Sequence, residues 1–135
     1  PKKIAEGIDS NRLLILTSVL SKIANISVDN HDVIVNVMKG QTIKNVNSDF
    51  GICLSVLSSL YNVGFEKNTM AIGEIALTGE IRNPSNLDRI LKEGVRLGIK
   101  KAYIGRLNDK EITSSKDIEI ISFNDIKSVS TTLFK

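Results

Sequence analysis

Residues 73–82 of the sequence read Gly-Glu-Ile-Ala-Leu-Thr-Gly-Glu-Ile-Arg, and this stretch says most about the architecture. Apolar and β-branched residues favour a strand over residues 69–75, and the turn residues Thr78 and Gly79 precede a second extended piece. Gly73 and Gly79 are too far apart for a dinucleotide-binding glycine fingerprint, and the sequence contains no phosphate-binding P-loop motif. The stretch therefore predicts two short extended segments joined by a turn.

Helical patterns lie on both sides of this stretch. Asp9 or Ser10 can cap a helix over residues 11–24, in which apolar residues recur at spacings of three and four. Ser48 can cap a helix over residues 49–61, which is apolar almost all round and is expected to lie between layers. The other predicted elements are a strand over 32–37, a helix over 86–97 opened by Pro84 and Ser85 and stopped by Gly98, strands over 101–105 and 118–122, and a helix over 125–133.

The composition is that of an ordinary folded domain. The chain has 135 residues, of which 41% are hydrophobic and 4% aromatic, so we expect one domain with an aliphatic core. No apolar run reaches the length of a membrane span and the first residues have no signal-peptide pattern, so a cytoplasmic location is the default expectation. The net charge of +3 permits nucleic-acid binding but is weak evidence for it.

Two residue types with reactive side chains occur once each. Cys53 is the single cysteine and His31 the single histidine, so the chain has no disulfide framework and no zinc site of the usual composition. We expect Cys53 to be a buried structural thiol in a helix and His31 to lie at a strand edge. No metal site is predicted.

Four stretches resemble one known family. They are residues 73–82, residues 87–102, the helix start Gly-Ile-Asp-Ser-Asn-Arg-Leu-Leu-Ile-Leu at 7–16, and the strand Asp-Val-Ile-Val-Asn-Val at 32–37 with Gly40. Taken in their order along the chain, they are similar to the Lon-protease-like domain of bacterial RadA (Sms) DNA-repair proteins. The resemblance spans about residues 7–134. Within it, Asn11-Arg12-Leu13 and Asn36-Val37 favour this family over Lon-like domains of the ComM or magnesium-chelatase type.

The resemblance implies an α+β fold, with layered helices on a mixed sheet as in the second domain of ribosomal protein S5. It implies that residues 1–135 form a single Lon-like domain without a cofactor, because RadA proteins carry their zinc finger and RecA-type ATPase ahead of it. ATP, magnesium and zinc are therefore expected only in such a preceding part. It also implies a hexameric ring, contact with DNA during ATP-driven branch migration, and the recombinase RecA as a partner of the longer protein.

The resemblance also bears on proteolysis. Active Lon enzymes use a serine nucleophile activated by a lysine. Aligned on Gly51 and on Leu87, the two positions are occupied here by Asp49 and Asp88, and neither carboxylate can replace an alcohol or an amine. Ser48 is one residue away, which turns its side chain by about 100° on a helix. We therefore expect no peptidase activity from this dyad.

Two interpretations of the aspartates stay open. Each lies in the first turn of a predicted helix, where a negative charge is stabilised by the helix dipole. Alternatively, the resemblance places Asp49 and Asp88 close together, with a raised pKa on one of them or with a cation such as Arg89 or Lys92 between them.

The helix predicted over residues 86–97 carries a basic stripe. Arg89, Lys92, Arg96 and Lys100 fall within about 80° of one another at 100° per residue. They lie opposite the apolar side, and Arg82 and Lys101 are near in sequence. Such cations can neutralise DNA phosphates without reading bases. The alternative is a solvated helix face on which Glu93 pairs with Arg89. The apolar side itself is formed by Leu87, Ile90, Leu91, Gly94 and Leu97.

Three functions follow from these observations. The leading one is a non-enzymatic module that supports ring assembly and holds DNA. The second is an oligomerisation scaffold without DNA contact. The third, an active Lon-type peptidase, requires residues that the aligned positions lack.

Overall fold

The computed structural model describes residues 1–38, 41–108 and 116–134 and contains both helices and strands. Gly40, part of one quoted block, lies outside the described residues. The helices are α1 (Ser10–Lys22), the short 3-10 helix η2 (Val46–Ser48), α2 (Asp49–Tyr61), α3 (Leu87–Arg96) and α4 (Ile126–Leu133). The strands are β1 (Lys3–Glu6), β2 (Val33–Asn36), β3 (Thr69–Ala71), β4 (Glu74–Ile75), β5 (Ile81–Arg82), β6 (Lys101–Gly105) and β7 (Glu119–Phe123).

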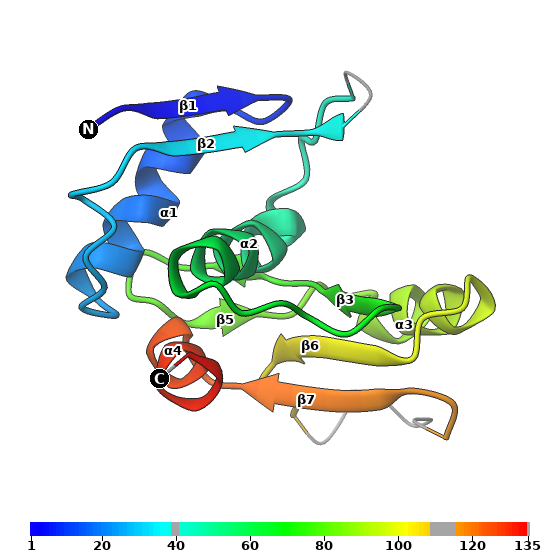
Figure 1. Ribbon diagram of the computed structural model, residues 1–135. Helices are drawn as coiled ribbons and strands as arrows, with labels where there is room; N and C mark the ends of the chain where they lie inside the picture. The colour runs from blue at the N-terminus through cyan, green and yellow to red at the C-terminus, as the bar shows by residue number, and fades with distance from the viewer. Residues whose placement is uncertain (39–40, 109–115, 135) are drawn as a thin grey trace.

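The strands form three small sheets among the described residues (Figure 1). β1 pairs with β2 in parallel, β3, β6 and β7 form a parallel sheet in the order β3-β6-β7, and β4 pairs with β5 in antiparallel fashion. The α+β class is confirmed. The expected single mixed sheet is replaced by these separate sheets.

A break at Gly73 separates two of the sheets. The strand predicted over residues 69–75 is interrupted after Ala71 and resumes at Glu74. Gly73 has a φ of +151°, and a Cβ atom there would lie 2.8 Å from Cγ2 of Ile81. Because only glycine fits this backbone and this contact, the chain turns here and β4 leaves the sheet of β3. The predicted turn and second extended piece are confirmed as the β4–β5 hairpin.

The largest core surrounds α2. Figure 1 shows α2 between the β1–β2 pair and the remaining sheets, and its buried residues Phe50, Cys53, Leu54 and Leu57 belong to a cluster that also includes residues of α1 and α4. The predicted burial of α2 between layers is thus confirmed. The prediction of an aliphatic core is wrong in part, because the few aromatic rings are concentrated here. Ring contacts link Tyr61, Phe65, Tyr103, Phe123 and Phe134.

A second, smaller cluster lies under α3. Leu87 and Leu91 pack on Ala102 and Ile104 of β6 and on Ile118. Leu97, predicted on the apolar side of this helix, is 68% exposed instead. The helix ends at Arg96, and Gly98 follows with a φ of +96°, so Leu97 belongs to the turn that leaves the helix. Gly98 as the stop of the helix is confirmed.

β1 was not predicted. Its sequence, Lys-Ile-Ala-Glu, has too few β-branched residues for a strand signal. It forms by parallel pairing with β2, in which Lys3 lies opposite Val33 and Glu6 lies opposite Asn36.

None of the helices in the described ranges is long and apolar enough to span a lipid bilayer.

Candidate functional site

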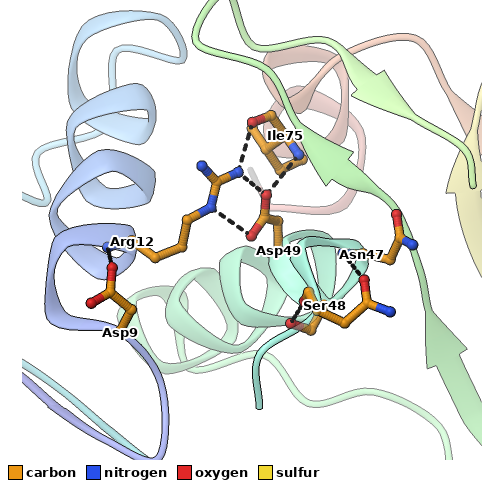
Figure 2. Close-up of polar contacts among 7 residues, drawn as sticks. Asp9, Arg12, Asn47, Ser48, Asp49 and Ile75 are labelled. Atoms are coloured by element: carbon orange, nitrogen blue, oxygen red, sulfur yellow. Dashed lines mark hydrogen bonds and ion pairs between the residues drawn. The ribbon is translucent and has the colours of Figure 1, made fainter.

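A partly buried ion pair joins the starts of α1 and α2 (Figure 2). Nε of Arg12 donates to Oδ1 of Asp49 at 2.9 Å, and Nη2 donates to Oδ2 of the same carboxylate. The backbone N–H of Ile75 donates to Oδ2 at 3.1 Å, and Nη2 of Arg12 also donates to the carbonyl of Ile75 at 3.3 Å. Asp49 therefore has partners at both oxygens, in the two-point arrangement that makes arginine–carboxylate pairs strong.

Local structure holds each partner in place. The Asp9 side chain caps α1 by accepting from the N–H of Arg12, as predicted, and so fixes Arg12 in the first turn. The start of α2 is tied to the glycine before β4, because Phe50 donates to the carbonyl of Gly73 at 3.0 Å and Gly73 donates to Asn47 at 2.8 Å. Residues 73–75 thus hold the start of α2 through backbone hydrogen bonds and place the backbone N–H of Ile75 next to Asp49.

The pair is shielded unequally from solvent. The side chain of Asp49 is 1% exposed and that of Arg12 is 25% exposed. The hydrogen bonds that Arg12 donates to Asp49 raise the pKa of the Arg12 guanidinium above its ordinary value, against a smaller opposing effect of burial. A buried carboxylate needs such compensation, because an unpaired charge in the interior is strongly unfavourable.

A cavity of about 490 Å³ opens beside the pair. It is lined by Gly7, Ile8, Asp9, Arg12, residues 42–46, Ser48, Asp49 and Ile52. Ser48 lies at the start of α2, as predicted, but its hydroxyl does not cap the helix. It donates instead to the carbonyl of Asn45 at 2.6 Å. Lys44 lines the same cavity, and within the described ranges no hydrogen bond joins its amine to Ser48.

Asp88 has a different environment. It lies in the first turn of α3 and its Oδ2 is 3.0 Å from Nζ of Lys92, one helical turn later. Its side chain is 39% exposed. The hypothesis of one cation between the two aspartates is not met: Arg12 is the partner of Asp49 and Lys92 that of Asp88. Both aspartates do lie in the first turn of a helix, as the simpler interpretation requires.

Among the described residues, neither Cys53 nor His31 forms a side-chain hydrogen bond with the Arg12–Asp49 pair. Cys53 is fully buried in α2, and burial, followed by the charge of Asp49, raises the pKa of its thiol well above the ordinary value. His31 is exposed just before β2. Both expectations are confirmed.

The predicted basic stripe is exposed but partly paired. Lys92 pairs with Asp88, and Nε of Arg96 donates to Glu93 at 3.0 Å. The expected Glu93–Arg89 pair is therefore replaced by Glu93–Arg96, in which the hydrogen bond lowers the pKa of Glu93 and raises that of Arg96. Arg89 and Lys100 are exposed and form no ion pair with another described residue.

The two flanking cations differ from each other. Arg82 is 63% exposed and 3.9 Å from Glu80. Lys101 lies in β6 with only 15% of its side chain exposed, between Glu66 at 3.2 Å and Glu119 at 3.9 Å. The hydrogen bond to Glu66 raises the pKa of Lys101. Lys101 would have to leave these carboxylates to reach a phosphate.

Arg12 is the site residue that the sequence did not single out. It lies in the block at 7–16 that resembles the RadA family, so a signal was present. Its role was hidden because its partner lies 37 residues away in sequence.

No protein-family model matches the chain. Curated proteins similar to it nevertheless identify its family. It is 35% identical over 127 residues to the DNA repair protein RadA of Halalkalibacterium halodurans, covering 94% of this chain and 28% of that protein. RadA of Chlamydia trachomatis is 36% identical over 129 residues, again covering 94% and 28%. RadA of Aquifex aeolicus is 35% identical over 134 residues, covering 99% and 30%.

The chain thus spans less than a third of the length of the curated relatives it matches. The similarity extends along almost all of its own residues, at the same level in bacteria as different as these three. The resemblance of the four sequence blocks is confirmed, and the chain belongs to the RadA family of bacterial DNA-repair proteins.

Proposed function

We propose that residues 1–135 form a Lon-like module of a RadA-type DNA-repair protein that cuts no peptide bond and instead holds DNA and supports ring assembly. The observation that carries this proposal is the Arg12–Asp49 pair. It occupies the position at which the resemblance places the serine nucleophile of active Lon enzymes, and both carboxylate oxygens are engaged. A side chain held in this way stabilises the junction of α1 and α2 and supplies no nucleophile.

The absence of proteolysis is tested with fluorescein-labelled casein. We expect no release of fluorescence above buffer from the wild-type chain, with an active Lon protease as positive control. The variants Ser48→Ala and Lys44→Ala remove the serine hydroxyl and the lysine amine that line the cavity beside the pair. Hydrolysis by the wild-type chain that either substitution abolishes would contradict the proposal.

DNA contact is supported by the exposed face of α3. Arg89, Lys92 and Arg96 project from this helix and Lys100 follows it, while Arg82 and Lys101 flank it with their glutamate partners. Exposed ion pairs such as Lys92–Asp88 contribute little to stability, so a phosphate can compete for the cation. Such contacts give sequence-independent binding that weakens with salt.

Fluorescence anisotropy with a labelled duplex tests this contact at two salt concentrations. The double variant Arg89→Glu/Arg96→Glu should weaken binding at least about tenfold. It should also make the slope of log affinity against log salt concentration shallower, by the amount expected for the loss of about two phosphate contacts. The matched control is Lys22→Glu/Lys127→Glu, which changes the net charge equally on α1 and α4, away from α3 (Figure 1). Equal loss in both variants would mean that net charge alone attracts DNA.

The alternative is a scaffold for assembly without DNA contact. Equally weak binding of duplex DNA by the wild type and by the Arg89→Glu/Arg96→Glu variant would favour this scaffold. Light scattering after size-exclusion chromatography measures whether the chain assembles, and a hexamer is the expected ring. ATP hydrolysis, its magnesium and a zinc finger belong in this proposal to other parts of a RadA protein, as does contact with RecA.

A further inference from the structure

The side chain of Asn83 ties the end of β6 to the residue that follows β5. Its Oδ1 accepts from the N–H of Gly105 at 2.7 Å, and its Nδ2 donates to the carbonyls of Gly105 and Arg106, each at 3.1 Å. One amide thus satisfies three backbone groups at the point where β6 ends. The backbone of Arg106 is therefore fixed by a side chain from another element.

The two segments approach each other closely. Gly105 is buried, and a Cβ atom at this position would lie 2.5 Å from the carbonyl oxygen of Ile81. Only glycine lets the end of β6 come this near to β5, and the two strand ends are seen together in Figure 1. Because Arg82 directly precedes Asn83, the backbones of Arg82 and Arg106 are held near each other.

The two arginines carry like charges with little compensation. Arg106 is exposed and forms no ion pair with another residue in the described part of the chain. Arg82 is 63% exposed, and the nearest oxygen of its partner Glu80 is 3.9 Å away. Like charges that are held near each other repel, and an anion bound beside both removes this repulsion. The arrangement therefore favours an anionic ligand.

We propose that Arg106, together with Arg82, contacts a phosphate of bound DNA, and that Asn83 positions Arg106 for this contact. The proposal rests on the function proposed above and adds to it a residue that follows a strand and lies outside α3. Arginine suits this role because its planar guanidinium can donate two parallel hydrogen bonds to one phosphate. Contact of this kind does not depend on the base sequence.

The position of the two arginines extends the basic stripe of α3. The helix begins at Leu87, shortly after Asn83 in the chain, and its 10 residues span about 15 Å. Lys100 follows the other end of the helix, just before β6 begins. DNA that lies along α3 would therefore meet cations at both ends of the helix as well as on its exposed face.

Fluorescence anisotropy with labelled duplexes of two unrelated sequences tests Arg106. Arg106→Ala should weaken the binding of both duplexes at least about threefold, and should make the slope of log affinity against log salt concentration shallower by about one phosphate contact. The matched control is Lys22→Ala, which removes one exposed cation from α1 and should change the affinity much less. Equal effects of the two substitutions would overturn the proposal. Weaker binding by Arg89→Glu/Arg96→Glu in the same assay would still support DNA contact by α3.

A double-mutant cycle tests whether Asn83 acts through Arg106. Asn83→Ala removes the hydrogen bonds to the end of β6 and should weaken duplex binding in the wild-type chain. In the Arg106→Ala chain the same substitution should have no further effect, because the side chain to be positioned is gone. Additive losses would overturn the positioning role of Asn83. Urea denaturation checks that each variant folds, and the comparison of Arg106→Ala with Lys22→Ala does not depend on the folding of Asn83→Ala.

Nuclear magnetic resonance of the arginine Nε–H groups distinguishes DNA from a free phosphate compound. Duplex DNA and inorganic tripolyphosphate should each shift the Nε–H signals of Arg82 and Arg106, and neither should shift that of Arg12, which is bonded to Asp49. Bound duplex with unmoved Arg82 and Arg106 signals would overturn the proposal and leave the function proposed above intact. Shifts with tripolyphosphate in a chain that binds no duplex would overturn DNA contact altogether and leave a site for free phosphates.

Discussion

At the scale of single residues, Arg12 and Asp49 illustrate how a charged pair can fix the junction of two helices. Asp49 is inaccessible to solvent, and its three hydrogen bonds come from a guanidinium and one backbone amide. Removing one partner of a buried pair leaves the other charge uncompensated, whereas replacing both by apolar side chains removes that penalty. The two effects can be separated by a double-mutant cycle.

We expect Arg12→Met to lower the free energy of unfolding by about 2–4 kcal/mol, toward the lower end for a buried pair because Arg12 is partly exposed. Asp49→Leu in the same chain should restore part of the loss. Urea denaturation measures all three variants. The exposed pair Lys92–Asp88 provides the control, and Lys92→Met/Asp88→Leu should change stability by only about 0.5 kcal/mol. If the substitutions at the two pairs lowered the free energy of unfolding equally, the role assigned to burial would be contradicted.

Cys53 leads to a prediction about pH. Burial raises the pKa of its thiol in the folded chain, whereas the unfolded chain has the ordinary value of about 8.5. Below that pH the thiol is protonated in both states. Above it only the unfolded chain loses the proton, so folding stability must fall by up to about 1.4 kcal/mol per pH unit. Urea titrations at pH 8 and 10 should show a smaller fall for Cys53→Ala than for the wild type.

The same burial predicts an unreactive thiol. A thiol reagent such as Ellman's reagent should leave the folded chain unmodified and react with the single cysteine once urea unfolds it. Rapid reaction of the native chain at neutral pH would contradict the burial of Cys53.

At the scale of elements, the sequence predicts what is local and misses what is paired at a distance. The bounds of α2 are predicted correctly because its apolar run and its start at Ser48 are contiguous signals. β1 escapes prediction because a strand of four residues becomes one only against β2. Asp49 and Asp88 could be assigned to helix starts because the signals for a helix start are local. Arg12 could not be identified as the partner of Asp49, because the two residues are far apart in the sequence.

Gly73 is where an element boundary depends on one backbone position. Gly73→Ala should lower the free energy of unfolding by more than about 1 kcal/mol, because the new Cβ atom meets Ile81 and the φ of +151° is strained for alanine. The control is Gly64→Ala, where an added Cβ has nothing within 4 Å. Thermal denaturation compares the two. A Gly73 variant as stable as the Gly64 variant would mean that β4 can shift without loss.

At the scale of the whole molecule, β6 connects the two hydrophobic clusters. Its residues alternate between them: Tyr103 belongs to the cluster around α2, whereas Ala102 and Ile104 belong to the cluster under α3. Because successive side chains of a strand point to opposite faces, one strand contributes to both cores. Neither cluster can lose its packing without disturbing β6, so we expect the chain to unfold as one cooperative unit.

Leu57 and Leu91 test this expectation, since each is almost completely buried, one in each cluster. Leu57→Ala and Leu91→Ala should each lower the free energy of unfolding by about 2–5 kcal/mol, through lost burial and a residual cavity. In both variants the backbone signal from circular dichroism and the fluorescence of tyrosine should follow a single urea transition, because Tyr103, one of the two tyrosines, lies on the strand that the clusters share. If Leu91→Ala instead melts α3 at low urea while tyrosine fluorescence stays native, the two clusters are separate folding units. The basic face of α3 would then be carried by a part of the chain that can unfold while the junction of α1 and α2 remains intact.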